Sequence, residues 1–161
     1  MSFGQFIALA SFLLSAGVIA VTYWVGVAQE TVKVCVPFLH GCTDITYTGL
    51  KGDAGFIFRG GLVSGCVFIL VWWHCMRVWL QPSIQSRASR INLNLMTFFG
   101  MLAAVGLIWG TAVLAPTKEQ VLWGPHIRGA NTFFEAILLA ISFNFYLIWR
   151  GRKDGLLEVP S

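Results

Sequence analysis

Four long apolar stretches, at residues 5–28, 55–80, 93–115 and 129–149, divide the chain. A bilayer hydrocarbon core is about 30 Å thick, and about 20 helical residues are needed to cross it. Each stretch reaches that length and is continuously apolar, which does not suit the short alternating strands of a membrane β-barrel. The pattern predicts an all-α polytopic membrane protein with four transmembrane helices in a compact bundle, a single transmembrane domain over residues 1–161.

The segments between these stretches are short, and the longest covers residues 29–54. The first basic residue is Lys33, so the first stretch lacks the positive start of a secretory signal peptide and is expected to be retained as a helix. We expect no separate soluble domain. Any function is therefore expected in the helices or in the 29–54 loop.

Basic residues near the ends of the spans indicate the orientation. One side of the membrane receives six of them and no acid in its loop, and the other receives five together with several acids. The six are Arg77, Arg87, Arg90, Arg150, Arg152 and Lys153. Because positive charge stays on the cytoplasmic side, we expect both termini in the cytoplasm of a cell-membrane protein and the 29–54 loop outside.

Composition agrees with this class of protein. Hydrophobic residues make up 57% of the chain and charged residues 11%, whereas a soluble domain carries about 25% charge. The formal net charge of +4 comes from basic residues that flank apolar runs, not from a basic patch. A soluble enzyme and a nucleic-acid partner are therefore not expected.

Small residues recur four positions apart in three of the spans, at Ser11 and Ser15, Gly61 and Gly65, and Gly106 and Gly110. This spacing lets helix backbones approach closely in lipid, where van der Waals contact must replace the hydrophobic drive. The seams are expected to hold the four helices together. Alternatively, they dock a membrane-protein partner.

An acidic residue, Glu135, is placed inside the fourth span. Ionisable residues at such depth are costly and indicate function by default. Arg128, Asn131 and Glu135 follow i, i+3, i+7 spacing and share one helical face, and Arg59 enters from the same side of the membrane. The pattern predicts an Arg59–Glu135 pair. It is either an interhelical clamp or part of a polar pocket for a lipid head group.

The 29–54 loop contributes His40 and Asp44, and His126 lies on the same side at the mouth of the fourth span. These groups are candidates for the rim of the pocket. A His–carboxylate pair could also serve acid–base chemistry. We favour a third interpretation, in which they hydrogen-bond to loop backbone groups.

Cys35 and Cys42 are placed in the loop that we expect outside, where a disulfide between them is plausible. Cys66 and Cys75 fall within the second span and are expected to be small core residues. The histidines do not suit a metal or haem site, because His74 is placed near the opposite side of the membrane from the other two. We therefore expect no metal and no cofactor.

Several short motifs carry a family resemblance. They are Pro37-Phe38-Leu39, Ile45-Thr46-Tyr47-Thr48-Gly49, Gly55-Phe-Ile-Phe58, Gly106-Leu-Ile-Trp-Gly110 and His126-Ile-Arg-Gly-Ala130 before Phe133 and Phe134. In this order they resemble the multi-pass family that includes the damage-regulated autophagy modulator and the GPI-anchor lipid-remodelling protein. The resemblance implies membrane lipid organisation or remodelling, with Thr48, Gly49 and His126 at a shared outer-face site. Tyr47 replaces the Asp usual in the family, and the relatives usually have additional helices.

These observations favour a non-catalytic protein that binds, senses or organises outer-leaflet lipid through a polar intramembrane pocket. The first alternative is an accessory subunit of a larger membrane complex. The second is a lipid-remodelling enzyme that uses His126 with Asp44, which we rank last because no activated nucleophile is visible.

Overall fold

The computed structural model describes residues 2–36, 41, 43–114 and 123–157. Within these ranges the chain is helical and contains no strand. Four long helices follow one another: α1 (Phe3–Ala28), α4 (Gly52–Leu80), α5 (Arg87–Ala112) and α6 (Trp123–Lys153). Each is long and apolar enough to cross a membrane, which confirms the prediction of an all-α, multi-pass membrane protein.

Two short helical segments lie between the long helices. The α3 helix (Ile45–Thr48) belongs to the loop between α1 and α4, and the 3-10 helix η1 (Gln81–Ser83) follows α4. All four long helices begin before the predicted stretches. The α5 helix begins at Arg87, six residues before the predicted start, and ends at Ala112, three residues before the predicted end. Its first turn is capped by Ser86, whose hydroxyl accepts a hydrogen bond from the Ser89 backbone N–H at 3.0 Å.

Replacement of this cap tests whether α5 begins where the structure places it. We expect Ser86→Ala to lower the free energy of unfolding by about 1 kcal/mol, because one N–H of the first turn loses its acceptor. Thermal unfolding in detergent measures the change. Ser142→Ala, on the exposed face of α6, is the control, and an equal effect of both substitutions would contradict this helix start.

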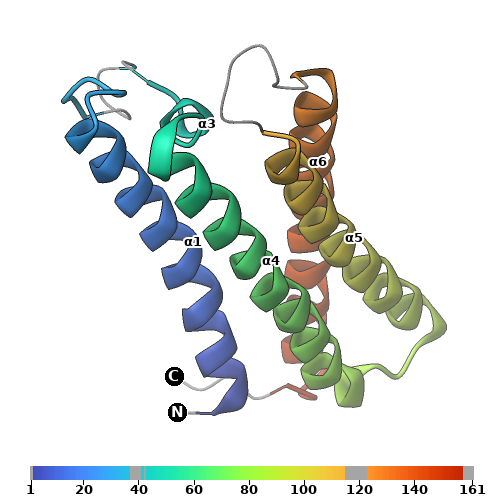
Figure 1. Ribbon diagram of the computed structural model, residues 1–161. Coiled ribbons are helices and arrows are strands. Elements are labelled where there is room, and N and C mark those ends of the chain that lie inside the picture. Colours follow the sequence, from blue (N-terminus) through green and yellow to red (C-terminus); the bar gives the residue numbers. More distant parts are fainter. Residues whose placement is uncertain (1, 37–40, 42, 115–122, 158–161) are drawn as a thin grey trace.

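The long helices pack mainly in chain order, α1 on α4, α4 on α5 and α5 on α6 (Figure 1). Among the described residues, α1 and α6 do not form a main helix pair. The four helices therefore form a more open arrangement than the compact bundle that we expected. The outward faces of α1 and α6 are left exposed in the monomer, with large apolar residues such as Phe12 and Leu138 on them.

Close contacts at glycines hold two of the helix pairs together. A Cβ atom at Gly61 would lie 2.3 Å from the Val18 side chain, so this glycine brings α4 against α1. A Cβ atom at Gly129 would lie 2.5 Å from the backbone nitrogen of Gly110, where α5 and α6 cross. The seams at 61/65 and 106/110 are therefore used inside this chain, as the first interpretation predicted.

Two buried clusters lie at opposite ends of the bundle. Trp73, Met96 and Leu147 belong to a cluster built from α4, α5 and α6. Leu50 and Phe58 belong to a smaller cluster near α3. The end of the bundle that holds the smaller cluster, where α1 ends and α6 begins, is called the loop end. The opposite end is called the terminal end. The start of α1 and the end of α6 both lie at the terminal end (Figure 1).

Candidate functional site

The side chain of Glu135 lies on the exposed face of α6, whereas Ala136 and Ala140 on the opposite face are buried. No hydrogen bond or ion pair to Glu135 occurs among the described residues, where the one ion pair joins Arg150 to Asp154 at 2.9 Å. Asn131 and Arg128 are exposed on the same face, as their spacing predicts. The three residues do not gather around a pocket with Arg59.

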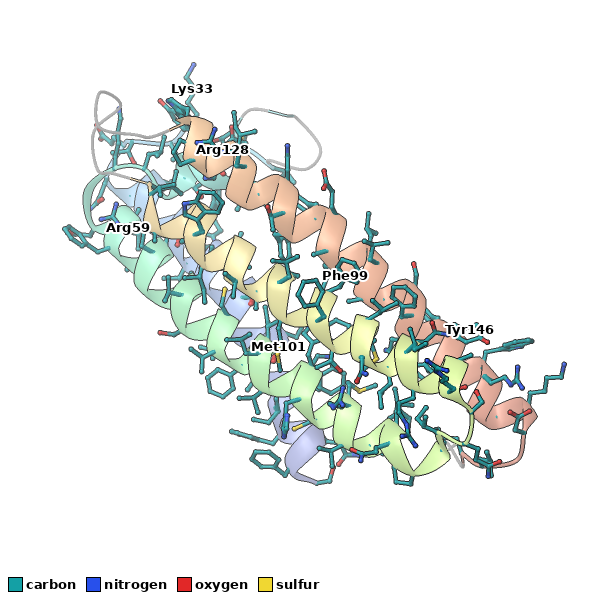
Figure 2. The ribbon with its side chains drawn as sticks, turned by 90° about the vertical axis from the view of Figure 1, so that its right-hand side faces the viewer. Lys33, Arg59, Phe99, Met101, Arg128 and Tyr146 are labelled. Carbon is teal, nitrogen blue, oxygen red and sulfur yellow. The ribbon has the colours of Figure 1, made fainter. Side chains whose placement is uncertain are left out.

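Arg59 has a different partner from the one that we predicted. Its Nη1 donates a hydrogen bond to the Leu114 carbonyl at 2.7 Å, and its guanidinium lies 5.3 Å from the centre of the Phe56 ring. The predicted Arg59–Glu135 pair is therefore wrong. The physical reason is that α5 packs between α4 and α6, and the chain just beyond its C-cap offers the Leu114 carbonyl to the cation. Figure 2 shows Arg59 and Arg128 at the same end of the bundle as Lys33.

His126 connects three elements at the loop end. Its Nδ1 lies 2.7 Å from the Gly110 carbonyl oxygen in α5, and its Nε2 lies 3.5 Å from the Thr46 hydroxyl in α3. A carbonyl oxygen only accepts, so Nδ1 carries the proton and donates it, and Nε2 faces the Thr46 hydroxyl. The Trp123 ring meets the imidazole edge to face at 5.8 Å. The sequence singled out His126 but not these partners.

Asp44 caps α3, because its carboxylate accepts a hydrogen bond from the Tyr47 backbone N–H. Both nitrogens of His126 face Thr46 and Gly110, so the described residues form no His126–Asp44 hydrogen bond. This geometry favours the interpretation in which the loop groups hydrogen-bond to the backbone, and it gives the acid–base pair no support. His40 lies outside the described residues.

Thr48 and Gly49 are both buried at the end of α3. The Thr48 hydroxyl donates to the Ile45 carbonyl at 2.7 Å, and a Cβ atom at Gly49 would lie 2.3 Å from the Phe58 ring. Close contact with Phe58 therefore requires glycine at this position. These two residues place α3 against α4. Thr48 also lines an apolar cavity between α1 and α3.

The loop that follows α1 is fixed by several local bonds. The Tyr23 hydroxyl accepts a hydrogen bond from the Cys35 backbone N–H at 2.9 Å and donates one to the carbonyl of the same residue. Cys35 is disulfide-bonded, and its predicted partner, Cys42, lies outside the described residues. Gln29 donates to the Asp53 carboxylate at 2.8 Å, which ties the end of α1 to the start of α4. Cys66 and Cys75 are free.

Two cavities meet at Asp44, beside the loop end of α1. The first, of about 330 Å³, lies between α1 and α3 and has an almost wholly apolar lining. Ala16 and Ala20 form part of its wall on α1, and Tyr23 and Trp24 line it as well. Small side chains at these two α1 positions leave space beside the larger aromatic ones.

The second cavity, of about 1020 Å³, is open and lies among the loop residues. Its polar lining includes Glu30, Thr31, Lys33, Thr43 and Asp44. We call the two together the α1–α3 groove, an apolar lower part joined to a polar upper part at Asp44. An apolar pocket with a few polar groups at one end is the usual form of a small-molecule site.

Sequence reasoning predicted Asp44 and Thr48 of this groove, and it missed Ala16, Ala20, Tyr23 and Lys33. The available signal was weak. It consists of two alanines four positions apart, followed by an aromatic pair at the end of the same span. Such a face is also typical of an ordinary lipid-exposed helix. Only the position of α3 beside α1 encloses it.

No group of three His, Cys, Asp or Glu residues in the described part of the chain could hold a metal ion. Comparison with known proteins finds no matching family model, no matching characterised protein and no matching solved structure. The chain is therefore defined by its architecture as a four-helix, multi-pass membrane protein. The resemblance to the family of lipid-remodelling proteins stays a prediction from the sequence.

Proposed function

We propose that this protein binds or senses outer-leaflet lipid at the α1–α3 groove, without catalysing a reaction on it. The observation that supports the proposal most directly is the junction at Asp44 of an apolar cavity with a polar one. A phospholipid has the same division between acyl chains and head group. The site is therefore moved from the Arg59–Glu135 region, where we first expected it, to the opposite edge of the bundle.

The depth of the groove fits a lipid that enters from the membrane. Tyr23 and Trp24 belong to the last turns of α1, and such residues concentrate at the level of the head groups. The apolar cavity extends from them toward Ala16, into the region of acyl chains. The polar cavity extends the other way into the loop, at the level of the head group. With both termini in the cytoplasm, this is the outer leaflet of the cell membrane.

The polar part has side chains for both charges of a zwitterionic head group. Lys33 is an exposed cation that suits a phosphate. The hydroxyls of Thr31 and Thr43 donate to the Gly26 and Asp44 carbonyls, so they offer a head group hydrogen-bond acceptors. Glu30 and Asp44 suit an amine. Glu30 has a φ of 56°, in the left-handed region that a non-glycine residue adopts at an energetic cost. This is the usual conformation of the residue that follows a helix C-cap, and here it ends α1.

A substitution that partly fills the apolar cavity tests the proposal. We expect Ala16→Leu to weaken phospholipid binding about fourfold, since displacement of one buried methylene costs about 0.8 kcal/mol. Titration of a fluorescent phospholipid into the full chain in mild detergent measures the affinity. Lipid mass spectrometry of the purified protein provides an independent readout.

The matched control is Ala28→Leu, an exposed alanine of the same helix that lines neither cavity. It should bind lipid as the native chain does. Equal affinities for Ala16→Leu and Ala28→Leu, with both variants folded, would contradict the groove as the lipid site.

A further inference from the structure

Glu135 occupies the middle of the α6 span. It lies twelve residues after Trp123 and fourteen before Trp149, which is about 18 Å and 21 Å along the helix axis. Both tryptophans are exposed, and such residues mark the membrane interfaces. Because the hydrocarbon core is about 30 Å thick, the Glu135 carboxylate lies near mid-depth.

The surroundings of Glu135 on α6 offer it no compensation. Leu138 and Leu139 are 65% and 44% exposed on the same side of the helix. The Ser142 hydroxyl donates to the Leu138 carbonyl within α6. Arg128 shares the face but lies seven residues away, about 10 Å toward the loop end. A carboxylate at mid-depth on a lipid-facing surface is energetically costly, and membrane proteins avoid it unless a partner covers the charge.

We propose that the outward face of α6, formed by Asn131, Glu135, Leu138 and Ser142, docks against a transmembrane helix of a different membrane protein. The partner helix carries a Lys or Arg at mid-depth that pairs with Glu135. Asn131 and Ser142 add polar groups that can hydrogen-bond across a helix pair, and Leu138 adds apolar contact. Charge complementarity with Glu135 favours a basic transmembrane helix as the partner. A lipid head group is not the partner, because it does not reach the bilayer centre.

A second copy of this chain does not supply the missing cation. The arginines of the α4 span are engaged at its two ends. Arg59 donates to the Leu114 carbonyl, and Arg77 donates to the Asn94 side chain at 2.8 Å. A two-fold pair of parallel α6 helices would place Glu135 opposite Glu135, which is repulsive. The partner is therefore a basic helix of another protein.

The test uses the full chain with a donor fluorophore at its C-terminus, reconstituted in phosphatidylcholine vesicles. Two synthetic leucine-rich helices carry the acceptor, one with a central Lys and one with Leu in its place. We expect energy transfer to report at least tenfold tighter association with the Lys helix. Glu135→Gln should remove this preference, whereas Ser86→Ala, at the N-cap of α5 and away from this face, should retain it.

A charge reversal completes the design. The Glu135→Lys variant should no longer associate with the helix that has a central Lys, and it should bind a helix with a central Glu instead. Equal binding of the Lys and Leu helices by the native chain would overturn the proposal, and so would Glu135-dependent self-association of labelled copies. Lipid binding at the α1–α3 groove does not involve this face, so the two proposals succeed or fail separately.

Discussion

Gly129→Leu is expected to separate α5 from α6 and to lower the stability of the protein more than any other substitution considered. A Cβ atom at this position would lie 2.5 Å from the Gly110 nitrogen and 2.9 Å from the Gly106 carbonyl oxygen. These are backbone atoms, which cannot rotate away as a flexible side chain can. The helices must therefore move apart, and the loss should reach the upper end of the about 1–3 kcal/mol typical of overpacked cores.

The measurement is thermal unfolding of the purified protein in detergent. A loss of about 3 kcal/mol corresponds to a midpoint lowered by about 10 °C for a chain of this size. Gly124→Leu is the matched control, because it lies in the first turn of the same helix with nothing within 4 Å of its Cβ position. Equal midpoints for the two variants would show that the close α5–α6 crossing is absent in the folded protein.

The four spans could be predicted because the signal for them is local. Each span is a continuous apolar run, and a long helix coincides with each predicted stretch, although α5 ends three residues before the predicted end at residue 115. The seams of small residues could also be predicted, since glycines four positions apart restrict which faces of two helices can pack together. Both features depend on residues that are neighbours in the sequence or on one turn of a helix.

The Arg59–Glu135 pair could not be predicted correctly because it depended on which helices are neighbours. Two groups that enter from the same side of a membrane still lie apart when a third helix packs between them. The spacing of Arg128, Asn131 and Glu135 fixed a shared face of α6 but not the direction of that face. In the structure it points away from α5, which changes an expected internal pocket into an exposed surface.

The α1–α3 groove was missed for a related reason. Tyr23 contacts Cys35 across twelve residues of chain, and this contact returns the loop over the end of α1. No local pattern specifies such a return. Asp44 and Thr48 were the exceptions, as both were predicted and both line the apolar cavity. An Asp before a short helical turn is a typical N-cap, and the predicted interaction of Asp44 with the loop backbone agrees with the cap that the structure has.

Tyr23→Phe should weaken phospholipid binding about tenfold while leaving the apolar cavity intact. The phenylalanine ring still fills the same wall, but the Cys35 N–H and carbonyl lose their shared partner. Unmade hydrogen bonds at part-buried backbone groups cost about 1–3 kcal/mol, and about 1.4 kcal/mol corresponds to tenfold in affinity. The loop that forms the polar cavity must then be ordered when lipid binds, which is why the loss falls on affinity.

Affinities measured for two different lipids distinguish the effect of Tyr23→Phe from that of Ala16→Leu. Tyr23→Phe should lower affinity for a phospholipid but change little for a diacylglycerol, which has the same chains and no phosphate head group. Ala16→Leu should lower affinity for both, since it acts on the cavity that holds the chains. Tyr146→Phe, at the opposite end of the bundle (Figure 2), is the matched control. If Tyr23→Phe weakened both lipids equally, the polar cavity would have no role in recognising the head group, and the groove would bind acyl chains alone.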